Sequence, residues 1–350
     1  MGISVPPSQI QSELSRIWDG LQSANKMRAS LFNLIFYTPK TERLDYIHTI
    51  AKKVTEKFPS RLIFITADRS AREEFLQTRV SVIPSGQVDI ACDLIEIDVS
   101  EKSRAKVPFL ILPHILTDLP IYVVWAEDPS KEDLLLQQFE KIADRLIFDS
   151  ECCKSLPAFA KTVLQLSSTC AVADLNWARI ESWRNLLSST FYSEERLDDL
   201  KKTDTIQLFY NQRPTASYCH TLLQSLYLQG WIACQLQWKL KQIQSNSLEY
   251  ERPGGKVHVT FYPEKHETIQ AGAIVSVELI TKDQVHFSFG RDLNFPHQVS
   301  MRFSTLEKCT VPLKYLFAKA ESGQSLVREI SHTGTSQHYL KLLQLFQNNG

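Results

Sequence analysis

Residues 31–57 read Leu-Phe-Asn-Leu-Ile-Phe-Tyr-Thr-Pro-Lys-Thr-Glu-Arg-Leu-Asp-Tyr-Ile-His-Thr-Ile-Ala-Lys-Lys-Val-Thr-Glu-Lys, and this stretch decides the expected fold. Leu31 to Tyr37 is a nearly continuous apolar run, which is typical of a strand that is buried on both faces. Thr38-Pro39-Lys40 ends the run and opens a helix. The apolar residues that follow have helical spacing, at Leu44, Ile47, Ile50, Ala51 and Val54. The stretch therefore predicts a strand, a turn and a helix in succession.

The same alternation continues through the first half of the chain. Further strands are expected at residues 61–66, 88–99, 120–125 and 145–148, and further helices at 10–21, 134–143 and 156–166. Strands that alternate with helices indicate an α/β layer around a mostly parallel, Rossmann-like sheet, here without nucleotide motifs. We expect this N-terminal domain to span residues 1–195.

The second half follows a different pattern. After the turn at Pro253-Gly254-Gly255, strict alternation over Val257, Val259 and Phe261 indicates a strand with one wet face. Three more strands are expected at 273–280, 284–289 and 298–303, and helices at 217–240, 321–330 and 337–346. A highly charged segment, residues 193–204, precedes this region. We therefore expect an α+β C-terminal domain with an antiparallel meander at residues 196–350.

The composition argues against several classes of partner. The 350 residues include 39 basic and 39 acidic ones, so no net charge attracts nucleic acid or anionic lipid. No apolar run approaches the roughly 20 residues that a membrane-spanning helix needs, and the N-terminal residues lack the layout of a secretory signal. We expect a soluble, cytoplasmic protein with neither a nucleic-acid nor a membrane partner.

Motifs for catalysis and cofactor binding are absent from the sequence. A dinucleotide site needs glycines where a strand turns into a helix, and no Gly-x-Gly-x-x-Gly occurs. Gly254-Gly255-Lys256 lacks the other residues of a phosphate loop, so a hairpin turn is the better interpretation. The seven cysteines are scattered, and His258 and His286, on two expected strands, have no carboxylate or thiol at matching spacing. We expect no catalytic residue, no cofactor and no metal.

Two groups of residues remain as candidates for other chemistry. Arg61, Asp118 and Arg145 stand at or near the ends of expected strands, and we consider them polar groups of a small-ligand crevice at the carboxyl edge of the sheet. Cys152 and Cys153 lie just before a helix, whose N-terminus lowers thiol pKa values, so they are candidates for a redox role. Solvated charges and unreactive reduced thiols are the alternatives.

The segment Asp-Leu-Asn-Trp-Ala-Arg-Ile-Glu-Ser-Trp-Arg, residues 174–184, concentrates two tryptophans and two arginines on one expected helix. Trp177 and Arg184 are seven residues apart, and Arg179 and Trp183 are four apart, so each pair shares nearly one face. Tryptophan and arginine anchor interfaces, which makes the segment a candidate partner-binding surface. The alternative is a core helix that Asp174 caps, with the indoles inside and the arginines reaching solvent.

Several motifs carry a resemblance to a known family. They are Phe58-Pro59-Ser60-Arg61, the strand from Asp118-Leu119-Pro120 to Trp125, the segment from Ala143-Asp144-Arg145 to Ser150, and residues 174–184, with a weaker similarity at 230–238. Together they resemble OpcA, the glucose-6-phosphate dehydrogenase assembly protein family. Phe58 stands where the family has histidine, and Trp125 where it has two tryptophans, whereas residues 174–184 match its signature position for position.

The resemblance implies a non-catalytic factor that binds glucose-6-phosphate dehydrogenase. Such a factor promotes the active oligomeric or conformational state of the enzyme in the oxidative pentose phosphate pathway, which produces NADPH. The resemblance also makes one segment a family signature, with the residues Asp174, Trp177, Arg179, Trp183 and Arg184. We expect its indoles to pack the helix against the sheet, and its arginines to orient the helix or contact the partner. The alternative function is a sugar-phosphate-binding protein or enzyme that uses the sheet crevice. The oligomeric state of the chain itself stays open.

Overall fold

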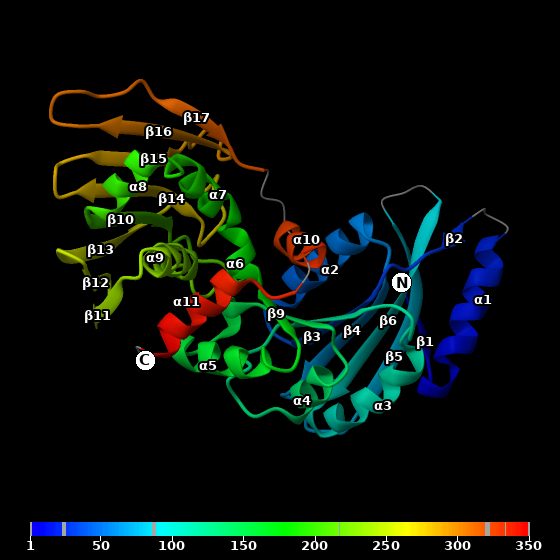
Figure 1. Ribbon diagram of the computed structural model, residues 1–350. Coiled ribbons are helices and arrows are strands. Elements are labelled where there is room, and N and C mark those ends of the chain that lie inside the picture. The colour runs from blue at the N-terminus through cyan, green and yellow to red at the C-terminus, as the bar shows by residue number, and fades with distance from the viewer. Residues whose placement is uncertain are drawn as a thin grey trace. The chain divides into compact units, whose positions relative to one another are not determined.

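A computed structural model describes residues 2–22, 26–85, 89–216, 218–318, 323–332 and 334–348 (Figure 1). The chain forms two compact units, the first from Met1–Leu175 with Ser322–Thr335 and the second from Asn176–Glu321 with Ser336–Gly350. The expected boundary between residues 195 and 196 instead falls inside α8 (Glu194–Lys201), a helix of the second unit. The charged residues there form a solvated helix that begins at the capping side chain of Ser193, and not a linker.

The first unit is built on a mostly parallel sheet. Its main parallel strands are β3 (Asn33–Pro39), β4 (Arg61–Asp68), β6 (Ile90–Ser100), β7 (Ile121–Trp125), β8 (Arg145–Phe148) and β9 (Ala171–Asp174). They lie in the order β6-β4-β3-β7-β8-β9, with parallel pairing throughout. The chain adds strands first on one side of β3 and then on the other, so the order reverses between β3 and β7. Nearly every residue of β3, β4 and β8 is buried, as continuous apolar runs predict.

Further strands extend this sheet beyond β6. They are β5 (Leu76–Pro84), β1 (Ile3–Val5) and β2 (Met27–Arg28). β5 pairs antiparallel with β6, and β1 pairs antiparallel with β5. β5 was not predicted from the sequence, because polar residues such as Gln77 and Arg79 alternate with the buried Thr78 and Val80 and no apolar run forms.

Helices pack on the sheet of the first unit. They are α1 (Ile10–Gln22), α2 (Leu44–Lys57), α3 (Val107–Ile111), α4 (Leu134–Glu140), α5 (Leu156–Leu166) and α10 (Gln324–Ser331). The side chains of Asp133 and Ser155 accept hydrogen bonds from backbone N–H groups at the starts of α4 and α5, which fixes where these helices begin. In the described part of the chain, no helix is long and apolar enough to cross a membrane.

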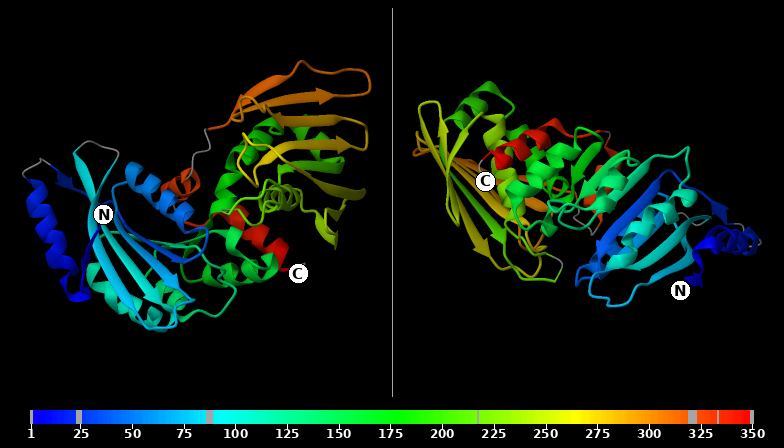
Figure 2. Two further views of the ribbon diagram at one scale, coloured as in Figure 1. Left: turned by 180° about the vertical axis from the view of Figure 1, so that it is seen from behind. Right: turned by 90° about the horizontal axis from the view of Figure 1, so that it is seen from below.

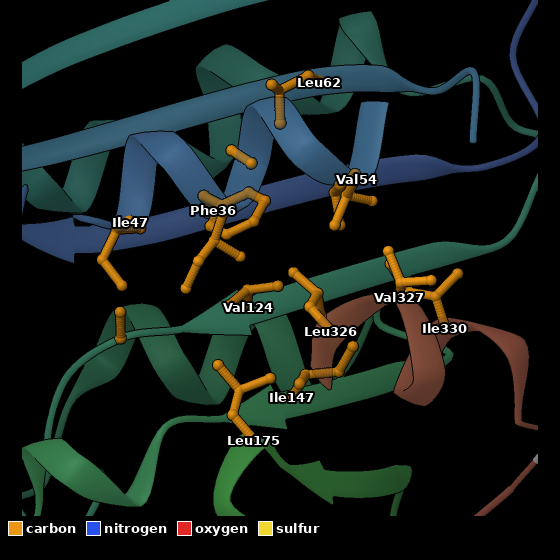
Figure 3. Packing of buried hydrophobic residues seen from close by; sticks show 14 of the residues in the cluster. Phe36, Ile47, Val54, Leu62, Val124, Ile147, Leu175, Leu326, Val327 and Ile330 are labelled. Atoms are coloured by element: carbon orange, nitrogen blue, oxygen red, sulfur yellow. The ribbon is translucent and has the colours of Figure 1, made fainter. Parts of the chain in front are cut away.

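The core of the first unit includes a helix from the C-terminal part of the chain. Leu326, Val327 and Ile330 of α10 join a buried apolar cluster with residues of α2, β3, β4, β7 and β8 (Figure 3). Gly323, which precedes α10, has a left-handed backbone (φ +84°), and a Cβ there would lie 2.8 Å from the Cβ of Lys53. Only glycine fits this close approach of α10 to α2.

The second unit is built on a mostly antiparallel sheet. Its strands are β10 (Thr203–Asn211), β11 (Lys239–Ile243), β12 (Ser247–Arg252), β13 (Gly255–Glu264), β14 (Ile274–Thr281), β15 (His286–Arg291), β16 (Gln298–Ser304) and β17 (Leu313–Leu316), in the order β11-β12-β13-β10-β14-β15-β16-β17. The expected meander holds for β14 to β16. It is wrong for β13, because β10 lies between β13 and β14 and pairs in parallel with β13. β10 was not predicted from the sequence, because it begins inside the charged segment 193–204.

Helices lie on one face of the second sheet (Figure 2). They are α6 (Leu175–Arg179), whose first residue belongs to the first unit, α7 (Glu181–Thr190), α8, α9 (Leu223–Gln235) and α11 (Gln337–Gln347). The alternation seen in the sequence is confirmed for β13, where Val257, Val259 and Phe261 are buried and His258 is exposed. A Cβ on Gly230 of α9 would lie 2.6 Å from Leu342 Cδ1 of α11, so glycine allows these two helices to pack closely.

Candidate functional site

The strand order of the first unit reverses between β3 and β7, and in open α/β sheets ligands bind outside the carboxyl ends of the strands at such a point. Here two aromatic side chains, in register on the two neighbouring strands, pack near the strand ends. Tyr37 of β3 stacks on Trp125 of β7, with ring centroids 4.0 Å apart and planes inclined by 15°. Both rings are almost fully buried. The carboxyl ends of the two strands therefore meet in a packed aromatic pair.

The loop after β3, residues 40–43, contains no glycine, and its last residue forms a buried ion pair. Arg43 donates from Nη2 to Asp149 Oδ2 at 2.5 Å and from Nη1 to Cys152 Sγ at 2.6 Å. Burial opposes the charged form of Arg43, but the neighbouring Asp149 carboxylate raises the pKa of Arg43 above its ordinary value. In dinucleotide-binding proteins this loop carries glycines that let the pyrophosphate approach the backbone. Side chains of this protein fill the corresponding place.

A second group of charges lies along the same edge. Arg69 Nη2 contacts Glu127 Oε2 at 2.7 Å, and Arg104 pairs with Glu101 at 2.8 Å and with Asp133. Burial raises the pKa of Glu127, and the nearby arginines oppose this shift. Because each of these guanidinium groups has a carboxylate partner inside the unit, neither is left unpaired to bind a phosphate.

The three residues that we expected in a crevice do not lie at the carboxyl edge. Arg61 and Arg145 are the first residues of β4 and β8, and Asp118 lies in the loop before β7, so all three belong to the amino edge. The expected placement is therefore wrong, because residues that begin parallel strands lie opposite the edge where the strand order creates a crevice. Asp118 is exposed.

Arg61 is part of a buried ion-pair cluster centred on Asp93. Its Nε and Nη2 donate to Asp93 Oδ2 at 2.9 and 2.7 Å, and its Nη1 donates to the carbonyl of His114 at 2.8 Å. Arg28 and the indole of Trp18 donate to the same carboxylate. Burial alone would raise the pKa of Asp93, but these donors and charges lower it overall. Arg61 thus holds the amino ends of neighbouring strands together.

Arg145 has a separate structural partner. Its Nη2 donates to Glu329 Oε2 at 2.6 Å, and its Nη1 donates to the carbonyl of Glu329 at 2.6 Å. Burial lowers the pKa of Arg145, and the Glu329 carboxylate only partly offsets this. The pair ties α10 to β8, so the structure brings Arg145 together with neither Arg61 nor Asp118.

The two adjacent cysteines have different surroundings. Cys153 is buried, and burial together with nearby carboxylates, Asp174 first, raises its pKa to about 12. The expectation of a lowered pKa is therefore wrong for Cys153, because carboxylates and desolvation outweigh the helix N-terminus. Cys152 is half-buried, and besides the contact with Arg43 it donates to the carbonyl of Ala126 at 3.3 Å.

The strand histidines do not form a metal site. His286 lies 2.9 Å from Glu278, and His258 lies 3.6 Å from Glu249, while β10 and β14 separate their strands. Within the described ranges, no group of three or more His, Cys, Asp and Glu side chains is arranged to hold a metal ion.

Residues 174–184 form two short helices and not the single helix that we expected. α6 ends at Arg179 and α7 begins at Glu181, because Ile180 has a non-helical backbone (φ −90°, ψ 3°). Asp174 ends β9 in the first unit, where its buried carboxylate accepts from the backbone N–H and the hydroxyl of Ser150 at 3.2 and 3.0 Å. Asp174 therefore fixes the neighbouring β8–α5 connection.

The signature tryptophans are core residues of the second unit. Trp177 lies 5.6 Å from Tyr339 of α11, and Trp183 lies 5.1 Å from Phe317, measured between ring centroids. Both indoles are buried, as one of the two interpretations predicts, but these aromatic partners lie on α11 and just after β17. The signature thus joins α6 and α7 to the rest of this unit.

The signature arginines are half-buried and lie over aromatic rings. The guanidinium of Arg184 lies 3.4 Å from the centre of the Trp177 ring and donates to the Trp177 carbonyl at 3.0 Å. Arg179 donates to Asn176 Oδ1 at 2.7 Å and lies 5.1 Å from the Tyr218 ring. Cation–π contacts of this kind orient the two helices.

Four residues near the carboxyl edge were not predicted as site residues from the sequence, namely Tyr37, Arg43, Trp125 and Asp149. Their positions could have identified them. Tyr37 and Trp125 are the last residues of expected apolar runs, Asp149 directly follows an expected strand, and Arg43 directly precedes a helix. The half-buried Arg291 was not predicted either. It lies 5.5 Å from the Trp183 ring and 5.0 Å from the Phe317 ring, and burial lowers its pKa to about 10.

Two family descriptions match successive regions of the chain. Residues 51–165 match the OpcA glucose-6-phosphate dehydrogenase subunit N-terminal domain, and residues 170–340 match the corresponding C-terminal domain. A relative from Synechococcus elongatus is 29% identical over 163 residues, which are 46% of this chain and 35% of the relative. A relative from Nostoc punctiforme is 24% identical over 209 residues, which are 58% of this chain and 43% of the relative. Both carry the provisional name OxPP cycle protein OpcA, and the matched regions span less than half of their length.

Among solved structures, the chain is similar to KijD10, a 3-ketoreductase from Actinomadura kijaniata that was crystallised with TDP-benzene and NADP. The TM-score is 0.50 at 9% identity, and the similarity covers 90% of this chain and 95% of that one. At this identity the similarity concerns the fold alone. The two family matches cover most of the sequence, as its motifs predicted, and the chain belongs to the OpcA family of glucose-6-phosphate dehydrogenase assembly proteins.

Proposed function

We propose that this protein is a non-catalytic assembly and activation factor. It binds glucose-6-phosphate dehydrogenase and promotes the active oligomeric or conformational state of that enzyme in the oxidative pentose phosphate pathway of the cytoplasm. Membership of the OpcA family supports the choice of partner. The side chains that fill the carboxyl edge of the first sheet support a role without catalysis.

The closed carboxyl edge is the observation that carries this proposal. The strand order of the first unit reverses between β3 and β7, and a nucleotide that bound at such a point would lie over the carboxyl ends of these two strands. A nucleotide in that place would have to displace the buried Arg43–Asp149 pair, which joins the loop after β3 to the end of β8. Separating a buried ion pair leaves two desolvated charges, which costs several kcal/mol, of the order of 3–5. The site is therefore poorly suited to bind a dinucleotide.

An activating partner acts through its affinity for different states of the enzyme. A protein that binds the active oligomer more tightly than the inactive form shifts the equilibrium toward the active oligomer, and no chemical group of the partner needs to enter the active site. A tenfold preference corresponds to about 1.4 kcal/mol. Such a preference can arise from a surface contact alone.

A titration with the dehydrogenase of the same organism tests the proposal. At fixed glucose 6-phosphate and NADP+, increasing amounts of the protein should raise the rate of NADPH formation to a plateau. The protein alone with the same substrates should form no NADPH. If the rate and the oligomeric state of the enzyme both stay unchanged, the proposal is wrong.

Thermal unfolding of the protein alone separates this function from the alternative, a sugar-phosphate-binding protein or enzyme. With the carboxyl edge closed, sugar phosphates and NADP+ at millimolar concentration should leave the melting temperature unchanged. A ligand that binds the folded state must raise the melting temperature. A clear rise with any of these compounds, in the absence of the dehydrogenase, would favour the small-ligand function.

A further inference from the structure

The strand β17 forms one edge of the second sheet. It pairs with β16 on one side, and no described strand pairs with its other side. Just after the strand, the N–H of Phe317 donates to the carbonyl of His297, so the backbone groups of Phe317 point toward β16. Backbone groups of successive residues alternate between the two sides of a strand, and those of Lys314 and Leu316 therefore point outward. This edge presents N–H and C=O groups with which a further strand can pair.

Exposed apolar side chains surround the same edge. Leu313 and Leu316 of β17 are 55% and 67% exposed, and Leu306 and Val311 of the preceding loop are 85% and 82% exposed. An open strand edge with apolar side chains is a template for pairing with another chain, and natural proteins usually blunt such edges. The combination of an unpaired edge and four exposed apolar side chains therefore indicates a surface that a partner covers.

The opposite edge of the sheet, β11, is built differently. Lys239 and Lys241 are exposed along it, and Lys241 Nζ pairs with Glu251 Oε2 at 2.8 Å. Ile243 is its one large apolar side chain with high exposure among the described residues of that strand. Charged edge strands discourage pairing. The chain thus protects one edge of the sheet and leaves the other apolar.

The charges around β17 define the chemistry of its partner. Lys308 and Lys314 are exposed, and in the described ranges no carboxylate lies within ion-pair distance of either ammonium group. A symmetric pairing of two copies with Lys314 opposite its own counterpart would place like charges face to face, which is destabilising. The edge fits an extended segment of another protein with apolar and acidic side chains.

The family signature holds this edge in place. Phe317 packs edge to face on Trp183, and the guanidinium of Arg291 lies over both rings. Arg291 also donates to the carbonyls of Ile274 and Pro296 at 2.7 and 2.5 Å. A rigid edge loses little conformational entropy when a partner binds, which favours affinity.

We propose that β17 is a docking edge to which an extended apolar and acidic segment of glucose-6-phosphate dehydrogenase adds as a further strand. The choice of this partner rests on the proposed function. Main-chain hydrogen bonds supply affinity in such strand addition, and alternate side chains supply specificity. The signature tryptophan then contributes to partner binding indirectly, through Phe317.

Substitutions at Leu316 test the docking edge. The affinity of the full chain for the dehydrogenase of the same organism is measured by biolayer interferometry, with circular dichroism and thermal unfolding as checks of folding. Leu316→Asp should weaken binding by at least about tenfold, because it places a carboxylate among apolar and acidic partner groups. Ile243→Asp, a similarly exposed substitution on the opposite edge, should change the affinity by less than about twofold.

A proline substitution separates the backbone contribution from that of the side chain. Leu316→Pro removes the outward N–H, which β16 does not use, and is expected to weaken binding more than Leu316→Ala. Lys314→Glu should weaken binding as well, whereas Lys239→Glu on β11 should not.

The possible outcomes distinguish the docking edge from the proposed function. If the unmodified chain binds the dehydrogenase and all folded variants at Leu316 and Lys314 bind equally well, the docking edge is wrong and the proposed function stands. If the unmodified chain does not bind, both are wrong. If the chain alone forms dimers that Leu316→Pro dissociates, a second copy occupies the edge and the proposal is overturned.

Discussion

The two units differ in the side chains that they place at the edges of their sheets. In the first unit, arginines at both edges of the parallel sheet pair with buried carboxylates, Arg61 with Asp93 at the amino edge and Arg43 with Asp149 at the carboxyl edge. In the second unit, the strand edge β17 exposes two leucines and a lysine to solvent. The difference suggests that the charges of the first unit are structural, whereas the second unit keeps a surface available for contact.

The largest expected effect comes from removing a buried carboxylate of the first unit. Asp93→Ala leaves Arg61 with a buried, uncompensated charge, and it removes the acceptor of Arg28 and Trp18. The free energy of unfolding should fall by about 3–5 kcal/mol, measured by urea denaturation. Asp118→Ala, at an exposed site in the same unit, should lower the free energy of unfolding by less than about 0.5 kcal/mol. If the two variants are equally stable, the charges of the first unit are not structural.

The next largest effect on stability is expected at the family signature of the second unit, where Trp177 is compared with Arg184. Trp177→Ala should lower the free energy of unfolding by about 3 kcal/mol, because it removes a buried indole that packs on Tyr339. Arg184→Glu should lower the free energy of unfolding by only about 1 kcal/mol, which is the magnitude of a partly exposed cation–π contact. Thermal and urea denaturation measure both changes. An equal loss of stability for the two variants would mean that Arg184 is as much a core residue as Trp177.

The pH dependence of stability tests the same ion-pair cluster without a large structural change. The pKa of Asp93 is lower in the folded state than in the unfolded chain, so its contribution is fully present above the unfolded value of about 4. This contribution should be lost as the pH falls from about 4 through the folded pKa. Urea denaturation of the parent and of Asp93→Asn, from pH 6 to pH 3, should show a weaker acid dependence in the variant. Parallel curves would exclude Asp93 as a source of the acid sensitivity.

The smallest effect concerns the thiols. With a pKa of about 12, Cys153 carries only about one thiolate in ten thousand molecules at pH 8. Mass spectrometry after brief iodoacetamide treatment at pH 8 should find Cys219 and Cys309, which are exposed, modified before Cys153. Early modification of Cys153 in the folded protein would restore it as a redox candidate.

The sequence predicted the continuous buried strands better than the half-exposed ones. β3, β7 and β8 lie where apolar runs placed them, because burial on both faces leaves no polar residue to interrupt the pattern. Alternation located β13 to β16, but β5 and β10 were missed because polar residues interrupt their apolar runs, and β10 also begins inside the charged segment 193–204. Neighbour relations such as β10 between β13 and β14 depend on long-range pairing, which local spacing does not encode.

The candidate site was predictable only in part. The signature at residues 174–184 was found because its residue types are distinctive, but its break at Ile180 and the aromatic partners of its tryptophans depend on packing. Arg61 and Arg145 were expected at the wrong edge of the sheet. Both residues begin their strands, whereas the crevice of such a sheet lies where the strands end. The Arg43–Asp149 pair joins residues that are 106 positions apart, which no local pattern reveals.

Sedimentation velocity of a mixture of the protein and glucose-6-phosphate dehydrogenase from the same organism tests the central claim most directly. Each protein is run alone and then together, at micromolar concentration and with glucose 6-phosphate and NADP+ present. The account predicts a new boundary that sediments faster than either protein alone and contains both chains. Two boundaries that keep the positions of the separate proteins would contradict it.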